Sequence, residues 1–246
     1  MIRHTLVVGF VIGAVGAVRA DDAKTVVEKG LKVSGWDKDK SPCMTWKEKG
    51  KFSGGGMELA YTGDWAVQLP DKYRFVIKAS FGGQDAEFKF TLNGDKAYES
   101  AFGMTQDVAG EKLTYTKNQL YAMRVQSLSP LLTDAAFKLT AVDGKDEDGK
   151  PTAGVRVDRE GKPTVNLYFD KATGLLVLSD IKTVNEFDGW KECTDESHLS
   201  DWKDIGNGIK AFHKFKVLRD GKPLIESDMS DFKRPEKLDP KLFEKP

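Results

Sequence analysis

The sequence predicts an α+β protein that is mostly β, with an antiparallel sheet of about ten or eleven strands covered by two or three helices. Apolar and polar residues alternate with a period of two through most of the chain from Met44 onward. Turn sequences separate these alternating segments, and only two segments show a helical pattern. Strands joined by short turns pair antiparallel, and a sheet this wide must curl or close. We therefore expect a strongly curved sheet.

Residues 1–20 have the pattern of a secretory signal peptide. Arg3 precedes the apolar run TLVVGFVIGAVGAV, and Val18 and Ala20 place small residues where signal peptidase reads them, which predicts cleavage after Ala20. An uncleaved anchor is the alternative, but the run of about 14 residues is shorter than the ~20 that span a bilayer. We expect an exported protein whose mature form, 21–246, does not span a membrane. The periplasm is the expected compartment, and the extracellular space is the alternative.

The composition is that of a globular protein. The 246 residues include 38 Lys and Arg against 38 Asp and Glu, and 39% of the residues are hydrophobic. A formal net charge of zero argues against a nucleic-acid binder that works by neutralising phosphates. No Pro/Ser-rich linker divides the chain, so residues 21–246 are predicted to form a single domain.

A helix is predicted over residues 22–34. Ala23, Val27 and Leu31 recur at helical spacing on one face, and Gly35 follows as a helix-ending residue. The helix precedes the first strands, so we expect it to pack on the sheet with this apolar face.

Three strands with alternating patterns follow at 57–69, 73–81 and 86–92. Pro70-Asp71-Lys72 separates the first two, and Asn93-Gly94 after the third is a strong signal for a tight hairpin turn. In each strand one face carries the large apolar and aromatic residues. That face is predicted to point inward.

The second half contains one more helix and further hairpins. Residues 111–129 place Leu113, Leu120 and Val125 roughly on one stripe, and Pro130 is expected to end or kink this helix. Further strands are predicted near 175–187, 195–204, 209–218 and 223–233. The sequences Asp-Gly-Lys-Pro or Glu-Gly-Lys-Pro recur at 148–151, 160–163 and 220–223 and predict hairpin turns.

No catalytic, metal-binding or cofactor-binding residue is predicted. His198 and His213, the histidines beyond the leader, show neither an HExxH motif nor a helical ligand spacing, and no GxSxG motif is present. Cys43 and Cys193 are the two cysteines of the chain. An oxidising compartment allows them to form a disulfide, while two separate thiols are the alternative.

Several ordered motifs resemble the family of periplasmic lipoprotein carriers, the LolA/LolB-like proteins. The segments that carry the resemblance are residues 62–67 with 69–75, 92–98, 128–132, 137–140, 165–176 and 237–243. The order and spacing of these motifs matter more than any one of them, and together they span roughly residues 22–246. In the lipoprotein carrier an arginine before the proline of the 69–75 motif helps to latch the helical lid, whereas this chain has Leu69 there. The chain therefore resembles an uncharacterised bacterial relative and not the carrier itself.

The resemblance implies an unclosed half-barrel with a helical lid over a hydrophobic cavity. We expect the lid to be the 111–129 helix together with the 22–34 helix. The inward-facing residues predicted to line the cavity are Trp46, Leu59, Tyr61, Trp65, Tyr73, Phe75, Ile77, Phe88, Phe90, Leu120, Leu167 and Phe169. Alternation identifies the apolar face but leaves open whether that face encloses a cavity or packs as a filled core.

Two functional hypotheses follow. The first is an exported non-enzymatic binding protein that holds a lipid, an acyl chain or a lipidated protein in the aromatic-lined cavity. The second is an envelope interaction or sensor module of the same fold, which binds a protein partner and no lipid. An internal cavity favours the first, and an exposed apolar patch without a cavity favours the second.

Overall fold

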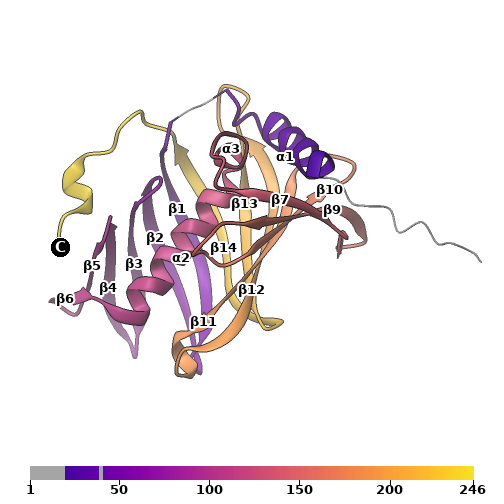
Figure 1. Cartoon of the computed structure of the whole chain (residues 1–246). Coiled ribbons are helices and arrows are strands. Elements are labelled where there is room, and N and C mark those ends of the chain that lie inside the picture. The colour runs from indigo at the N-terminus through magenta and orange to yellow at the C-terminus, as the bar shows by residue number, and fades with distance from the viewer. Residues whose placement is uncertain (1–19, 39–40) are drawn as a thin grey trace, which may run out of the picture.

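The computed structural model describes residues 20–38 and 41–246 and shows a curved antiparallel sheet that is not closed (Figure 1). Within these residues the sheet has 14 strands in the order β6-β5-β4-β3-β2-β1-β14-β13-β12-β11-β10-β9-β7, with β8 paired to β9. The strands are β1 (Cys43–Gly54), β2 (Met57–Gln68), β3 (Lys72–Phe81), β4 (Gln84–Asn93), β5 (Lys96–Ala101), β6 (Met104–Val108), β7 (Lys138–Val142), β8 (Asp146–Glu147), β9 (Lys150–Asp158), β10 (Val165–Asp170), β11 (Leu176–Asn185), β12 (Lys191–Asp204), β13 (Lys210–Arg219) and β14 (Lys222–Lys233). The predicted fold class is confirmed.

The strand number exceeds the expected ten or eleven because the additional strands are short. β8 has two residues, and β5, β6 and β7 have five or six each. So few residues give too few alternations for a period of two to stand out in the sequence. The predicted signal peptide, residues 1–20, lies outside the described residues except for Ala20, with which the first helix begins.

β2 illustrates how alternation builds the sheet. Tyr61 and Trp65 are buried on the inner face, while Thr62 and Asp64 are exposed on the outer face. A side chain at Gly63 would begin 2.3 Å from the Trp65 ring, so glycine allows that ring to lie flat over the strand. The repeated Gly-Lys-Pro turns join β8 to β9, β9 to β10 and β13 to β14, as predicted.

In the described part of the chain three α-helices accompany the sheet: α1 (Ala20–Ser34), α2 (Gly110–Gln126) and α3 (Ser129–Thr133), with short 3-10 helices η1 (Glu186–Asp188) and η2 (Pro240–Phe243). The predicted 22–34 helix is confirmed as α1. Its buried face of Ala23, Val27 and Leu31 packs against β7 and β9. α2 crosses the concave face of the sheet (Figure 1).

The single helix predicted over 111–129 is wrong at its C-terminal end. α2 ends at Gln126, and Leu128 has a φ of 62°, which no α-helix accommodates. Pro130 lies in the first turn of α3 instead of ending the preceding helix. Proline is tolerated there because the first-turn amides of a helix have no intrahelical acceptor. α2 and α3 together lead from β6 at one edge of the sheet to β7 at the other.

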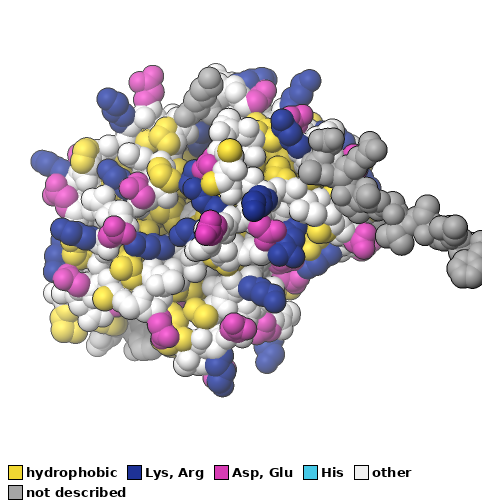
Figure 2. Space-filling view, in the orientation of Figure 1, with side chains coloured by type: hydrophobic (Ala, Val, Ile, Leu, Met, Phe, Trp, Pro, Cys, Tyr) yellow, Lys and Arg dark blue, Asp and Glu magenta, His cyan; other side chains and the backbone are white. Residues whose placement is uncertain are grey.

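The surface carries mixed charges. Figure 2 shows Lys and Arg side chains interspersed with Asp and Glu over the face seen in Figure 1, with hydrophobic side chains between them. No helix among the described residues is long and apolar enough to cross a membrane.

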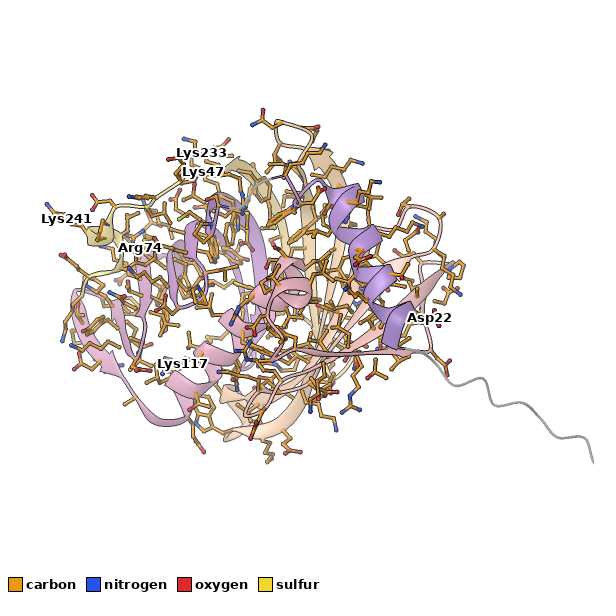
Figure 3. All side chains as sticks on the ribbon, turned by 45° about the horizontal axis from the view of Figure 1, so that its top comes forward. Asp22, Lys47, Arg74, Lys117, Lys233 and Lys241 are labelled. Atoms are coloured by element: carbon orange, nitrogen blue, oxygen red, sulfur yellow. The ribbon has the colours of Figure 1, made fainter. Side chains whose placement is uncertain are left out.

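The C-terminal segment closes back on the sheet. η2 contacts β3 and β4, and Figure 3 shows its Lys241 next to Arg74 of β3. Phe243 is buried, and its carbonyl accepts a hydrogen bond of 3.3 Å from Asn93. In the same view Asp22 marks the start of α1 over one half of the sheet, and Lys117 marks α2 over another part.

Candidate ligand-binding cavity

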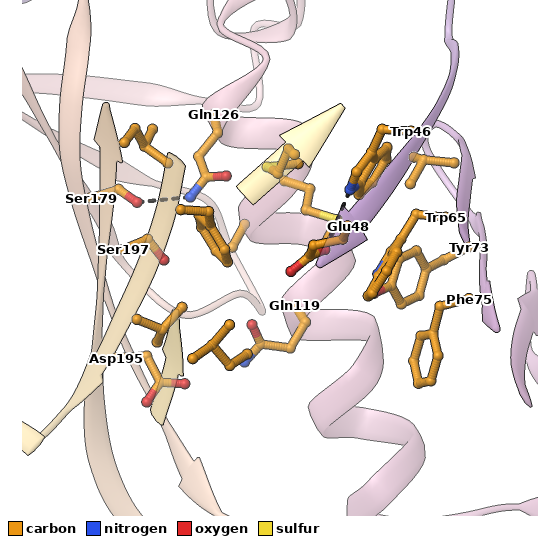
Figure 4. Close-up of a pocket in the computed structure, with 18 of the residues that line it drawn as sticks. Trp46, Glu48, Trp65, Tyr73, Phe75, Gln119, Gln126, Ser179, Asp195 and Ser197 are labelled. Carbon is orange, nitrogen blue, oxygen red and sulfur yellow. Dashed lines mark hydrogen bonds between the residues drawn. The ribbon is translucent and has the colours of Figure 1, made fainter. Parts of the chain in front are cut away.

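A cavity of about 800 Å³ lies between the concave face of the sheet and α2 (Figure 4). One wall is formed by β1 to β4 and the other by β10 to β14, while α2 contributes residues between them. The lining is mostly apolar. The sequence left open whether the inner face borders a cavity or packs as a filled core. The structure contains a cavity in one half of the molecule and a filled core in the other.

Nine of the twelve residues predicted for the cavity lie in its lining. They are Trp46, Leu59, Tyr61, Trp65, Tyr73, Phe75, Ile77, Phe88 and Phe90. All nine come from β1 to β4, which are strands of ten or twelve residues.

The other three residues pack in solid core. Leu167 and Phe169 of β10 belong to the buried cluster that the sheet forms with α1 and α2, and a side chain on Gly30 of α1 would begin 2.5 Å from the Phe169 ring. Leu120 of α2 packs with Leu92 and neighbouring residues of the sheet. Alternation correctly assigned the β10 residues to the inner face, but it could not show that helices cover them.

The aromatic wall is a continuous set of rings. Trp46 stacks on Trp65 at 6.1 Å between ring centroids, and Phe75 stacks on Phe90 at 5.5 Å. The Trp65 indole donates a hydrogen bond of 3.1 Å to the Tyr73 hydroxyl. Burial raises the pKa of that hydroxyl well above its ordinary value. This wall therefore presents ring faces to the cavity, and its polar atoms are bonded to one another.

The opposite wall carries a buried ion pair. The Arg219 guanidinium on β13 binds the Asp195 carboxylate on β12 through bonds of 2.7 and 2.8 Å, and both side chains are almost fully buried. The same guanidinium donates a hydrogen bond of 3.1 Å to the Tyr115 hydroxyl of α2. Burial, opposed by the nearby Arg219, raises the pKa of Tyr115 to about 12. Arg219 thus joins the far wall to the helix.

A second polar contact joins α2 to the far wall at its C-terminal half. The Gln126 amide donates a hydrogen bond of 2.8 Å to Ser179 of β11. Leu69, which occupies the position of the family's latching arginine, lies in the cavity lining and packs with the aromatic wall. The polar contacts of α2 with the cavity walls therefore come from Arg219 and Ser179.

Glu48 interrupts the aromatic wall at the middle of β1. Its carboxylate accepts hydrogen bonds from the Tyr61 hydroxyl at 2.7 Å and from the Trp46 indole at 3.5 Å. Burial raises the pKa of Glu48, and hydrogen bonds from Ser227, Tyr61 and Trp46 oppose this rise. The side chain is 7% exposed and lines the cavity.

The sequence did not identify the polar lining. Glu48 could have been found, because it lies in phase with Trp46 among the inward-facing positions of β1. The far-wall residues Ser179, Asp195 and Ser197 could not, since polar residues at alternating positions usually indicate the solvent face. The lining residues of α2, such as Thr116 and Gln119, were missed because most of them are polar, whereas Leu113, Leu120 and Val125 of the predicted apolar stripe lie outside the lining.

Exposed apolar side chains gather at one end of the cavity. Met57, Phe102, Met104 and Phe187 are the large hydrophobic residues exposed among the described part of the chain, and all except Met104 line the cavity. Met57, Phe102 and Met104 belong to hairpin ends, and Phe187 lies in the β11–β12 connection. Antiparallel pairing places these connections at the same end of the sheet. We call this end the cavity mouth.

Cys43 and Cys193 are both buried and free. Cys43 is the first residue of β1 and lies near the end of β14. Cys193 lies on β12, two residues before Asp195. Asp195 pairs with Arg219 of β13, and Arg219 pairs with Lys222 at the start of β14, so Cys193 lies near the opposite end of β14. The length of β14 therefore separates them, roughly 30 Å or more at ~3.3 Å per residue. That separation is far beyond the reach of a disulfide.

His198 and His213 lie outside the cavity lining. His198 Nδ1 is 2.6 Å from the Glu147 carboxylate, and His213 Nδ1 is 3.1 Å from a backbone carbonyl. Among the described residues, no group of three or more His, Cys, Asp or Glu side chains could hold a metal ion.

Comparison with known proteins identifies the fold through structure and not through sequence. The sequence matches no family model and no curated protein. A LolA superfamily protein from Nitrosomonas europaea superposes with a TM-score of 0.57 at 10% identity, covering 91% of this chain and 97% of its own. A DUF1329 family protein from Desulfovibrio piger gives 0.58 at 13% identity, covering 90% and 97%. A Vibrio parahaemolyticus domain, described as belonging to an outer membrane lipoprotein-sorting protein, gives 0.53 at 8% identity, covering 92% and 97%.

The sheet, the helices and the cavity together define a class of protein: an unclosed antiparallel half-barrel whose concave face, crossed by a helix, encloses an apolar space. Within that class the chain has a LolA-like fold. At identities of 8% to 13% these likenesses establish the fold, in agreement with the resemblance that the sequence motifs carry.

Proposed function

We propose that the protein is an exported, non-enzymatic binding protein that holds a lipid, an acyl chain or a lipidated protein in its cavity. The observation that carries this proposal is the aromatic-lined cavity of about 800 Å³. Sites for small ligands typically measure roughly 300–1,000 Å³ and are mostly apolar. Each Å² of apolar ligand surface buried there contributes about 25 cal/mol.

The predicted signal peptide supports export, with the periplasm as the proposed compartment. The lipoprotein-sorting name of the Vibrio parahaemolyticus domain, whose fold this chain shares, supports an acylated ligand. α2 is the proposed lid, because it crosses the concave face and contacts the far wall through Tyr115 and Gln126.

Substitutions at Ser197 and Ser200 test the cavity directly. Both residues lie on β12, but Ser197 lines the cavity whereas Ser200 is exposed. Ser197→Trp should fill part of the space and weaken binding of the neutral probe N-phenyl-1-naphthylamine by at least about tenfold, or ~1.4 kcal/mol. Ser200→Trp, the matched control, should bind the probe like the wild type. Probe fluorescence measures binding, and circular dichroism confirms that both variants fold.

Native mass spectrometry should identify the natural ligand. We expect protein recovered from an exporting bacterial host to carry additional mass that organic solvent extracts as a lipid. Protein that carries no such mass and also fails to take up the probe would contradict the proposal.

The cavity mouth favours a second candidate function, an envelope interaction or sensor module. Its exposed Phe102 and Met104 side chains, 63% and 73% accessible, are suited to contact a protein partner. Such a module would bind its partner without lipid. Uptake of the probe by wild-type protein, together with an extractable lipid, would argue against it.

A further inference from the structure

Glu48 places a carboxylate inside an otherwise aromatic wall. Figure 4 shows it beside Trp46 and facing the space in front of α2. Its hydrogen-bond donors among the described residues are the Trp46 indole and the Tyr61 hydroxyl. A carboxylate offers about four acceptor positions, so capacity remains for a further donor from the cavity side.

Two carboxylates of the lining are buried, Glu48 and Asp195, and of these Glu48 has no cationic partner among the described residues. Asp195 is neutralised by Arg219, and Lys112 by Glu99 of β5. Within residues 20–38 and 41–246, no Lys, Arg or His forms an ion pair with Glu48. A buried carboxylate without a countercharge is costly, and a cation entering the cavity would relieve that cost.

The rings around Glu48 also favour a cation. The Trp65 ring contacts both the Trp46 ring and the Tyr61 ring, with a centroid separation of 6.1 Å in each pair. Aromatic faces attract ammonium groups electrostatically, most strongly where water is excluded. A carboxylate set among three such rings provides both charge neutralisation and cation–π contacts for an ammonium group.

A second polar group faces the same space from the helix. The side-chain nitrogen of Gln119 is buried and has no hydrogen-bond partner among the described residues. Figure 4 shows this side chain on α2, between the wall that carries Asp195 and the wall that carries Trp65. Its amide is available to donate to an oxygen of the ligand, so the polar part of a ligand would lie at mid-cavity and its apolar part along the rings.

We infer that the cavity selects an amphiphile that carries a cationic ammonium group over one with an anionic head, and that Glu48 binds the ammonium. The inference rests on the proposed function and names the class of lipid for the same site: a lipid with an ammonium-bearing head. A free fatty acid, by contrast, would place its carboxylate against Glu48.

Competition for the bound probe tests this selectivity. Dodecylammonium, dodecanoate and dodecanol share one chain length and differ in head charge, and each is used at neutral pH below the concentration at which it aggregates. Wild-type protein should release N-phenyl-1-naphthylamine at about tenfold lower concentration of the ammonium than of dodecanoate, which corresponds to ~1.4 kcal/mol. Glu48→Gln should lose this preference while its affinity for dodecanol stays within about twofold of the wild type.

Glu58→Gln is the matched control. Glu58 lies on β2, is exposed and pairs with Lys51 at 2.8 Å, so its removal changes the net charge equally without touching the cavity. This variant should keep the wild-type preference. Equal or tighter binding of dodecanoate by the wild type, or an unchanged preference in Glu48→Gln, would overturn the inference while leaving lipid binding intact. Failure of dodecanol and the probe to bind at all would refute the proposed function as well.

Discussion

Glu48 shows at the scale of one residue how a cavity changes the chemistry of a side chain. Its neighbours on the inner face of β1 and β2 are aromatic, and burial among them favours the protonated acid. The hydrogen bonds that it accepts from Trp46 and Tyr61 favour the carboxylate, but the net result is a raised pKa. Folding therefore makes this group more basic, which links stability to pH.

The sign of that link is testable with Glu48→Gln. A folded-state pKa above the ordinary value of 4.5 means that the native protein keeps a proton which the unfolded chain has lost, so stability falls as the pH rises through that range. Glutamine does not titrate. We expect the free energy of unfolding of Glu48→Gln to rise relative to that of the wild type as the pH increases from about 4.5, and to level off above the raised pKa.

Urea denaturation at a series of pH values measures this difference. The titratable groups facing Glu48 are Tyr61 and Tyr73, whose pKa values burial raises further above 10, so they do not titrate in this range. Glu58→Gln, which removes an exposed carboxylate, should not reproduce the effect. Parallel stability curves for Glu48→Gln and the wild type would contradict the raised pKa.

At the scale of elements, the position of α1 decides which part of the sheet is core and which part is cavity. α1 packs against β7 and β9, and its Gly30 lets the helix approach Phe169 of β10 closely. α2 crosses the concave face and contacts β10 and β11, and the aromatic residues of β1 to β4 line the cavity beside it. Alternation predicts the inward face of every long strand, but the helix that covers it depends on contacts distant in sequence.

Gly30→Ala tests the close approach of α1. Alanine favours a helix by about 1 kcal/mol over glycine, yet its Cβ would lie 2.5 Å from the Phe169 ring. We expect a net loss of about 1–3 kcal/mol in the free energy of unfolding, because the ring or the helix must shift. Glu28→Ala, an exposed substitution on the same helix, should change stability by less than about 0.5 kcal/mol. A Gly30→Ala variant more stable than the wild type would show that α1 packs differently.

For the whole molecule, the sequence predicted the curved antiparallel sheet, its hairpins and the aromatic wall. Each of these depends on local signals such as the alternation in β2 and the glycine turns. The far wall was not predictable, because charged residues such as Asp195 and Arg219 usually indicate an exposed face. Their burial against Tyr115 of α2 depends on the curvature of the sheet, which the sequence pattern does not specify. Likewise, the sequence contains two cysteines, but the distance between them depends on the pairing register of the strands, which local signals do not predict.

The separation of the cysteines predicts that the fold is independent of redox conditions. Cys43 is 1% and Cys193 7% exposed, and burial raises the pKa of the Cys193 thiol to about 11. Both thiols should resist alkylation in the native protein and react after unfolding in guanidinium. A reducing agent should leave the melting temperature unchanged. A loss of stability on reduction, or the absence of free thiols in the unfolded chain, would contradict the structure.

The two free edges of the sheet, β6 and β7, are joined by the chain segment that contains α2 and α3. A closed barrel resists widening because backbone hydrogen bonds must break, whereas here the edges can separate by a change of curvature alone. The segment limits that motion: α2 has 17 residues and measures about 26 Å at 1.5 Å per residue, and a rigid helix does not stretch. Any ligand that forces the edges apart must therefore place α2 under tension. The force that a bound ligand exerts on the sheet then acts on the same helix that borders the cavity.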